Sequence, residues 1–334
     1  MQKQTTILLL SVVSILNSAL GGEVPKDLLI NKLQLYDACL SRLSCNYAYK
    51  VEALSGYEAF AEQDIQKLRK AYPNRPNLGA LPKSAVEGEE VVELQRYGNI
   101  TKRIVRDSRK MGDGNYQYIT DGAQTVIYDL DVGNARIMTS DPFITFLPFD
   151  RAIDRITREH LYPRKDDFSI ADFLKVATDS KVSSQGSNLV YELTLFRKEN
   201  PSRYDRLTLF VATKPDITIS KYILSFGILK NGQAIDHPAS EAHFSDFQQI
   251  QPGIWIPFSA IWSETSYTGP VDKTIAYPNL RHTLTISKIY DYDIKKDGDI
   301  KLEVPAGTRL SDDISGTTYN LLKTQMLPSD PKHK

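Results

Sequence analysis

The chain has 334 residues, of which 41 are acidic, 41 are basic and 41% are hydrophobic. A chain of this length and composition can bury a sizeable core. Its formal net charge of zero at pH 7 provides no general attraction to a polyanion. We therefore expect no nucleic-acid partner.

The first residues have the three-part form of a secretory signal peptide. Lys3 precedes an apolar run from Ile7 to Leu16, and the small-residue stretch Ala19-Leu20-Gly21 follows. We expect residues 1–21 to be removed on export across the inner membrane, with an uncleaved anchor as the alternative. The apolar run is too short for a spanning helix, and no later stretch is both long enough and uncharged. A periplasmic protein without a transmembrane span in its mature part is predicted.

An amphipathic helix is predicted directly after this segment. Leucine and tyrosine residues recur three and four positions apart, which draws one apolar stripe along a helix from about Lys26 to Leu43. Cys39 and Cys45 lie near its end and are a candidate disulfide in an exported protein. Six residues of unbroken helix would separate them by about 9 Å along the axis, too far for the bond. If they pair, the helix must end between them.

The next part of the chain contains strand signals and one insertion. Alternation begins at Tyr47, and a short helix is predicted over about Glu58–Lys70 within an insertion at residues 58–82. Strand signals return from Val91 to Ile119, and turn sequences such as Asp121-Gly122 predict hairpins.

A helical interlude separates these strands from a second set. It contains an apolar run between Pro142 and Phe149, and a helix predicted over about Ile170–Ala177 with Ser169 as its N-cap. Two interpretations are open. The region packs on the sheet in the ordinary way, or it is a mobile lid over an apolar concavity.

The strongest strand signal runs from Leu189 to Trp262, where apolar and polar residues alternate with period two. Turn sequences such as Lys214-Pro215-Asp216 separate the segments. They predict an antiparallel meander with one buried face. We expect one domain over residues 22–327, with a further insertion near 231–238 and a frayed polar tail at 328–334.

Few residues form a recognisable catalytic pattern. The chain has no nucleophile elbow, no zinc-protease motif and no phosphate-binding glycine loop. The best local cluster could bind zinc or share a proton; its members are Asp236, His237, Glu241 and His243. Because Pro238, Ala239 and Ser240 predict an irregular loop there, we interpret the cluster as a solvated turn.

A basic run lies on one of the predicted strands between Val91 and Ile119. It comprises Lys102, Arg103, Arg106, Arg109 and Lys110. On a strand these residues could present a basic strip to lipid headgroups or to an acidic envelope protein. A solvated outer face that protects a sheet edge is the simpler interpretation.

Two sequence stretches and the order of elements lead to a family resemblance. The stretches are Gly253-Ile254-Trp255-Ile256-Pro257 and Val304-Pro305-Ala306-Gly307-Thr308, the latter followed by Asp312 and Gly316. They are similar to recurring segments in longer secreted bacterial proteins of the LolA/LolB-like superfamily. The helix, the hairpins, the interlude and the meander also resemble this family of periplasmic lipoprotein carriers in their order.

The resemblance implies an α+β, mainly antiparallel β fold, in which a curved half-barrel sheet has helices covering its concave face. It implies a non-enzymatic carrier of lipoprotein acyl chains or lipids, without cofactor or metal, in outer-membrane lipoprotein sorting or envelope maintenance. Candidate ligand-binding residues are Tyr222, Leu224, Phe226, Trp255, Trp262, Phe143 and Phe146. The alternatives are a secreted metal-dependent hydrolase centred on His237, Glu241 and His243, and an envelope scaffold with a filled core.

Overall fold

The computed structural model describes residues 24–71, 83–98, 100–108, 114–121, 123–139, 158–159, 168–269, 273–291 and 300–327. The chain divides into two compact units, which we describe separately. The first contains Met1–Tyr36, Ile156–Pro257 and Pro270–Lys273. The second contains Asp37–Arg155, Phe258–Gly269 and Thr274–Lys334.

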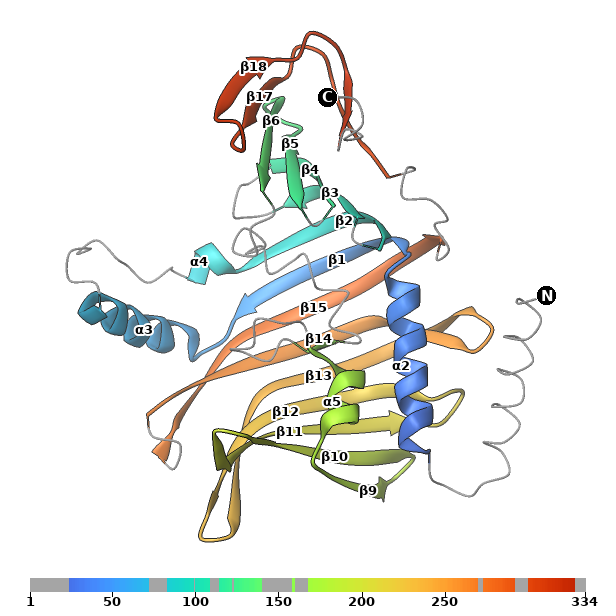
Figure 1. Ribbon diagram of the computed structural model, residues 1–334, viewed down its shortest axis with the longest axis vertical. Coiled ribbons are helices and arrows are strands. Elements are labelled where there is room, and N and C mark those ends of the chain that lie inside the picture. Colours follow the sequence, from blue (N-terminus) through green and yellow to red (C-terminus); the bar gives the residue numbers. More distant parts are fainter. Residues whose placement is uncertain are drawn as a thin grey trace. The chain divides into compact units, whose positions relative to one another are not determined.

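The first unit is built on the predicted antiparallel meander (Figure 1). Each strand pairs with the next one along the chain, in the order β9 (Asp179–Gln185), β10 (Asn188–Arg197), β11 (Asn200–Ala212), β12 (Thr218–Lys230) and β13 (Gln233–Gln251). Strand β14 (Ile254–Thr268) begins in this unit and continues into the second. A small ladder joins β7 (Arg158–Glu159) to β8 (Phe168–Ser169).

Two helices of this unit bury apolar side chains. Helix α2 (Lys26–Leu40) begins here and buries Leu29 and Leu33. Helix α5 (Ile170–Val176) packs on β10 and buries Phe173 and Leu174. The predicted N-cap is confirmed, because the Ser169 hydroxyl accepts the backbone N–H of Asp172 at 3.0 Å.

The second unit contains the remaining strands of the sheet. Their order is β18 (Thr317–Asn320), β17 (Arg309–Asp312), β6 (Asn134–Thr139), β5 (Gln124–Asp129), β4 (Gly114–Thr120), β3 (Ile100–Ser108), β2 (Gly88–Tyr97), β1 (Ser44–Ala53), β15 (Ile275–Asp291) and then the rest of β14. All these ladders are antiparallel except that between β17 and β6. Helices α3 (Tyr57–Ala71) and α4 (Lys83–Val86) and the ladder of β16 (Leu302–Val304) with β19 (Gln325–Leu327) complete the unit.

A separate apolar cluster forms behind β5, β6 and β17. Its buried members include Val126 and Ala135 from the first two strands and Leu310 from the third. The β16 residues Leu302 and Val304 cover them with no exposed surface. One face of these strands is therefore core, and alternation places their polar residues on the other face.

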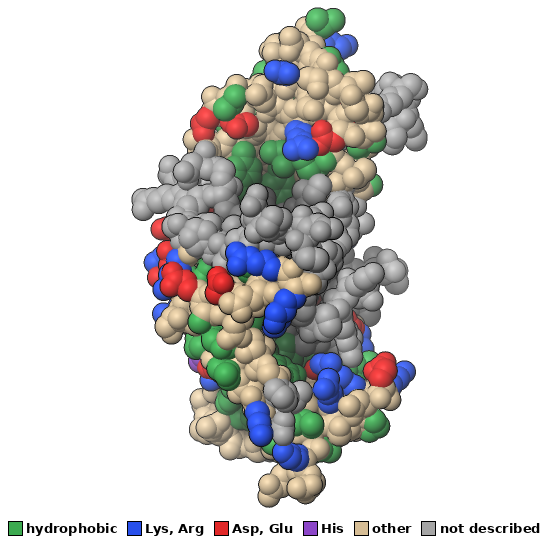
Figure 2. Space-filling model, turned by 90° about the vertical axis from the view of Figure 1, so that its left-hand side faces the viewer, with side chains coloured by type: hydrophobic (Ala, Val, Ile, Leu, Met, Phe, Trp, Pro, Cys, Tyr) green, Lys and Arg blue, Asp and Glu red, His purple; other side chains and the backbone are tan. Residues whose placement is uncertain are grey.

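The predicted fold class is confirmed. The chain is α+β and mainly antiparallel β, with one open sheet whose outermost strands are β9 and β18. Helix α3 is the helix predicted over Glu58–Lys70. No described helix is long and apolar enough to cross a bilayer. Acidic and basic side chains are interspersed on the face shown in Figure 2, and hydrophobic side chains also reach the surface there.

The insertion predicted near residues 231–238 stays a prediction, and the structure shows the conformation of this segment. Residues 231–238 are the end of the β12–β13 hairpin, and its two-residue turn is formed by Asn231 and Gly232, both with positive φ. The division of the mature chain into one domain stays a prediction. The run from Pro142 to Phe149 lies outside the described residues.

Candidate functional site

The helix-covered face of the first unit is lined by apolar side chains from neighbouring strands. Leu209 of β11 lies opposite Tyr222 of β12, and both have no exposed surface. Leu224, two residues further along β12, is 6% exposed. Alternation places these side chains on one face of the sheet. Two of the predicted ligand-binding residues, Tyr222 and Leu224, therefore belong to a buried apolar layer.

Hydrogen bonds of Lys32 attach helix α2 to the loops at one end of this face. The Lys32 ammonium donates to Asp216 Oδ2 at 2.6 Å and to the carbonyl oxygen of Gly253 at 2.5 Å. Asp216 lies between β11 and β12, and Gly253 lies between β13 and β14. One lysine, itself only 8% exposed, thus joins two separate turns to the helix.

A second polar contact is made by Tyr36, one helical turn after Lys32. The Tyr36 hydroxyl donates to the carbonyl oxygen of Ile217 at 2.8 Å. Burial, and after it the negative charge of Asp216, raise the pKa of Tyr36 well above its usual range, so this hydroxyl keeps its proton. Tyr191 of β10 also donates to the carbonyl oxygen of Val24, just before the helix. We call the contacts of Lys32 and Tyr36 the clasp.

The other predicted ligand-binding residues come from several parts of the chain. Phe226 is half-buried against the ring of His237, with centroids 5.2 Å apart. Trp255 is half-buried between buried Ile254 and Ile256, so alternation turns it to the opposite face of β14. Trp262 lies in the second unit, and Phe143 and Phe146 lie outside the described residues.

The proposed zinc cluster does not converge, and the loop predicted there is wrong. The residues lie in β13, where a bulge at Ala239 leaves Pro238 paired with Ser225 and Ser240 paired with Leu224. The extra residue reverses the alternation, so His237 faces the opposite side of the strand from Glu241 and His243. Hydrogen bonds from Lys221, and then from His243, lower the pKa of Glu241. Among the described residues, no group of three or more His, Cys, Asp or Glu side chains could hold a metal ion.

The second unit contains a buried polar and aromatic cluster that the sequence did not reveal. The imidazole of His282 stacks on Trp262 with ring centroids 5.1 Å apart and planes 6° apart. Its Nδ1 is hydrogen-bonded to the Tyr49 hydroxyl at 2.7 Å, and its Nε2 lies 3.5 Å from Glu264. These groups could share a proton, but Tyr49 and His282 are buried, which favours a structural role.

The interpretation of the basic run as one solvated strip is wrong. Alternation turns Arg103 to the inner face of β3, where it has no exposed surface and pairs with Glu90 at 3.0 Å. The Tyr116 hydroxyl donates to the other carboxylate oxygen of Glu90 at 3.2 Å. Arg106 is exposed and pairs with Glu93. Arg109 and Lys110 lie outside the described residues.

The two cysteines are free thiols in the structure. Helix α2 ends at Leu40, between them, and both side chains are buried. Burial raises the pKa of Cys39 to about 11 and that of Cys45 to about 12. The disulfide is not formed here and stays a prediction.

No family model and no curated protein matches the chain. Among solved structures, the chain is similar to a DUF1329 family protein from Desulfovibrio piger, with 12% sequence identity and a TM-score of 0.38 over 82% of this chain and 96% of that one. It is also similar to a domain assigned to outer membrane lipoprotein sorting from Vibrio parahaemolyticus, with 10% identity and a TM-score of 0.34 over 81% and 96% of the respective chains.

Proposed function

We propose that this protein is an exported, periplasmic, non-enzymatic carrier that holds the acyl chains of a lipoprotein or lipid on the helix-covered face of its first unit. The observation that carries the proposal is the apolar layer between helix α2 and the meander. Leu29 and Leu33 from the helix, and Leu209 and Tyr222 from the strands, are all nearly or fully buried.

The clasp gives this layer a defined way to open. Displacement of α2 would break the contacts of Lys32 with Asp216 and of Tyr36 with Ile217, and it would expose apolar side chains to water. Exposed apolar surface is unfavourable by roughly 25 cal/mol per Å². An acyl chain that entered beneath the helix would cover the same surface and offset that penalty. The ligand would therefore favour the open state through its differential affinity.

Mass spectrometry of organic extracts from gently purified mature protein tests the proposal, together with displacement of the apolar fluorescent probe bis-ANS. We expect lipid or lipoprotein acyl chains at near-equal amount and competitive displacement of the probe. Empty protein that does not bind the probe would contradict the proposal and favour an envelope scaffold with a filled core.

Substitution of the clasp lysine tests the mechanism. Lys32→Met removes the ammonium group but keeps an apolar side chain of similar length, so we expect a several-fold increase in probe affinity because the closed state is weakened. Lys50→Met is the matched control, because Lys50 pairs with Glu52 at 2.9 Å on an exposed part of β1. If both variants are folded by circular dichroism and bind the probe with equal affinity, the proposed opening of the apolar layer by displacement of α2 would be contradicted.

A further inference from the structure

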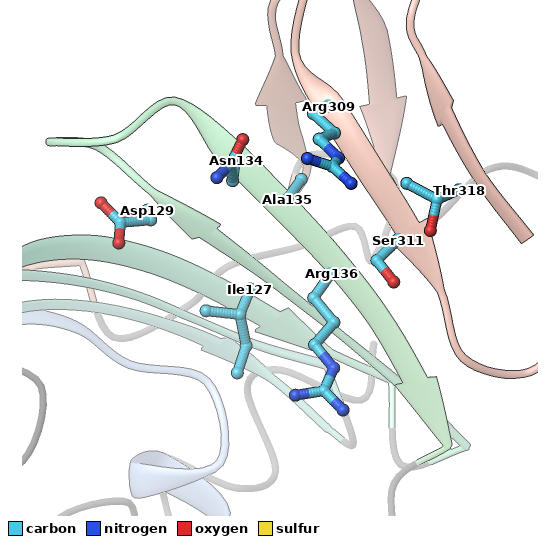
Figure 3. Close-up of a pocket in the computed structure, with 8 residues that line it drawn as sticks. All are labelled: Ile127, Asp129, Asn134, Ala135, Arg136, Arg309, Ser311 and Thr318. Carbon is cyan, nitrogen blue, oxygen red and sulfur yellow. The ribbon is translucent and has the colours of Figure 1, made fainter.

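A pocket of about 350 Å³ lies on the polar face of β5, β6, β17 and β18, within the second unit (Figure 3). Its side chains come from positions that are adjacent in the sheet ladders. In one row, Arg136 of β6 lies opposite Ser311 of β17, which lies opposite Thr318 of β18. In the next row, Asp129, Asn134 and Arg309 are neighbours on β5, β6 and β17. The pocket is thus fixed by the register of four strands.

The backbone beneath the pocket is held by the apolar cluster on the opposite face. Ala135 and Leu310 are paired neighbours on β6 and β17, and both are buried in that cluster. The side chains on either side of them in sequence therefore point away from the core. A site on paired strands above a packed core is better preorganised than one on a loop.

Of the two arginines that line the pocket, Arg136 forms an ion pair and Arg309 forms none with a described residue. Arg136 pairs with Asp313 at 2.5 Å. One carboxylate oxygen of Asp129 accepts the backbone N–H groups of Asp131 and Val132, both at 2.9 Å. This oxygen is therefore hydrogen-bonded within the turn that follows β5. Arg309 lines the pocket, is exposed, and forms no ion pair with any described residue. One guanidinium group is thus available to an anion.

The neutral lining groups include hydrogen-bond donors. Thr318 supplies a hydroxyl group from β18, and Asn134 supplies an amide next to Arg309. The hydroxyl of Ser311, on the strand between them, donates to Asp313 Oδ1 at 3.4 Å. Figure 3 shows Ser311 between Arg136 and Thr318, and Arg309 on the same strand as Ser311. A planar carboxylate offers two acceptor atoms, whereas a phosphate offers three or more directions of acceptance. Guanidinium and hydroxyl donors from several strands suit the phosphate.

We propose that this pocket is a binding site for a phosphate ester, with Arg309 as the principal cation and Thr318 and Asn134 as hydrogen-bond donors. Its volume lies at the lower end of the range for small-molecule sites and leaves room for a small group attached to the phosphate. The phosphate ester is either a free metabolite or the headgroup of an anionic phospholipid. The proposal does not depend on the carrier function, because it concerns a different set of strands.

Two binding measurements on the full mature chain test the site and distinguish the sources. Isothermal titration calorimetry with glycerol 3-phosphate reports a free phosphate ester, and cosedimentation with phosphatidylglycerol vesicles, against phosphatidylcholine vesicles, reports a headgroup. We expect binding to at least one of them, weakened by added salt. Arg309→Gln should reduce that binding at least tenfold, and Thr318→Val should reduce it several-fold.

The matched control is Arg281→Gln, which removes an exposed arginine from β15 of the same unit. It should bind as the unaltered protein does. Binding lost only for glycerol 3-phosphate supports a metabolite site, and binding lost only for phosphatidylglycerol supports a headgroup site. Absence of binding to either ligand, or an equal effect of Arg309→Gln and Arg281→Gln, would overturn the proposal.

Discussion

The ring of Tyr204 lies directly over Gly227 on the neighbouring strand, in the space that a Cβ at Gly227 would occupy. The ring is held there on several sides. Its hydroxyl donates to Asp236 at 2.8 Å, the Arg206 guanidinium lies 5.0 Å from its centroid, and Phe196 meets it edge-on at 5.8 Å. Arg206 also pairs with Asp236. The ring cannot move without loss of these contacts.

Gly227→Ala is therefore expected to lower the free energy of unfolding by about 1–3 kcal/mol, the usual range for overpacking. Chemical denaturation followed by circular dichroism measures it. In a Tyr204→Ala background the added methyl group meets no ring, so the same substitution should have little further effect. A full effect of Gly227→Ala in that background would assign the loss to the backbone rather than to the ring.

Stability at alkaline pH should depend on the same tyrosine. Burial, and then the hydrogen bond to Asp236, raise the pKa of Tyr204 to about 12. An unfolded tyrosine titrates near 10, so the folded protein holds this proton more tightly. Its contribution to stability is complete below pH 10 and is lost as the pH rises toward 12. Denaturation midpoints across this interval should fall more steeply for the unaltered protein than for Tyr204→Phe, and identical slopes would contradict the assignment.

The buried ion pair between Arg103 and Glu90 should be far more important for stability than its exposed neighbour. Arg103→Met leaves the Glu90 carboxylate buried without its cation, and we expect a loss of about 3–5 kcal/mol in urea denaturation. Arg106→Met, on the same strand, removes an exposed partner of Glu93 and should lower stability by less than about 1 kcal/mol. Equal losses in the two variants would mean that the pair does not experience a buried environment.

The two thiols should resist alkylation while the protein is folded. Their pKa values of about 11 and 12 leave almost no thiolate at pH 8, and both groups are buried. Iodoacetamide at pH 8, read by intact mass, should therefore label neither Cys39 nor Cys45 in the native state and both in urea. A native mass lower by two hydrogens, with labelling only after reduction, would instead establish the disulfide predicted from the sequence.

Local sequence patterns were sufficient for the elements whose signals lie within a few residues. Helix α5 begins at Ile170 because Ser169 caps it, and the meander follows from period-two alternation between turn sequences. Helix α2 follows from its leucine spacing, and its covering of an apolar face was expected. These features depend on neighbours along the chain, so one sequence contains enough information to predict them.

Features that depend on register or on distant strands could not be predicted in this way. The bulge at Ala239 changes which side chains share a face of β13. His237 therefore faces the opposite side of the strand from Glu241 and His243. The inward position of Arg103 became evident only with its partner Glu90 on β2. The phosphate pocket requires the pairing of Arg309 with Asn134, and nothing near either residue specifies the other.

The parallel pairing of β17 with β6 also has a consequence for the order in which the protein matures. A chain that emerges with its N-terminus first, from a ribosome or from a translocation channel, presents β6 long before β17. During that interval β6 has an open hydrogen-bonding edge, which is a template for association with other chains, and the cluster around Ala135 lacks Leu310. Strand β17 therefore covers the edge of β6 only after it has emerged, and a product truncated before Arg309 would keep that edge open for association with other chains.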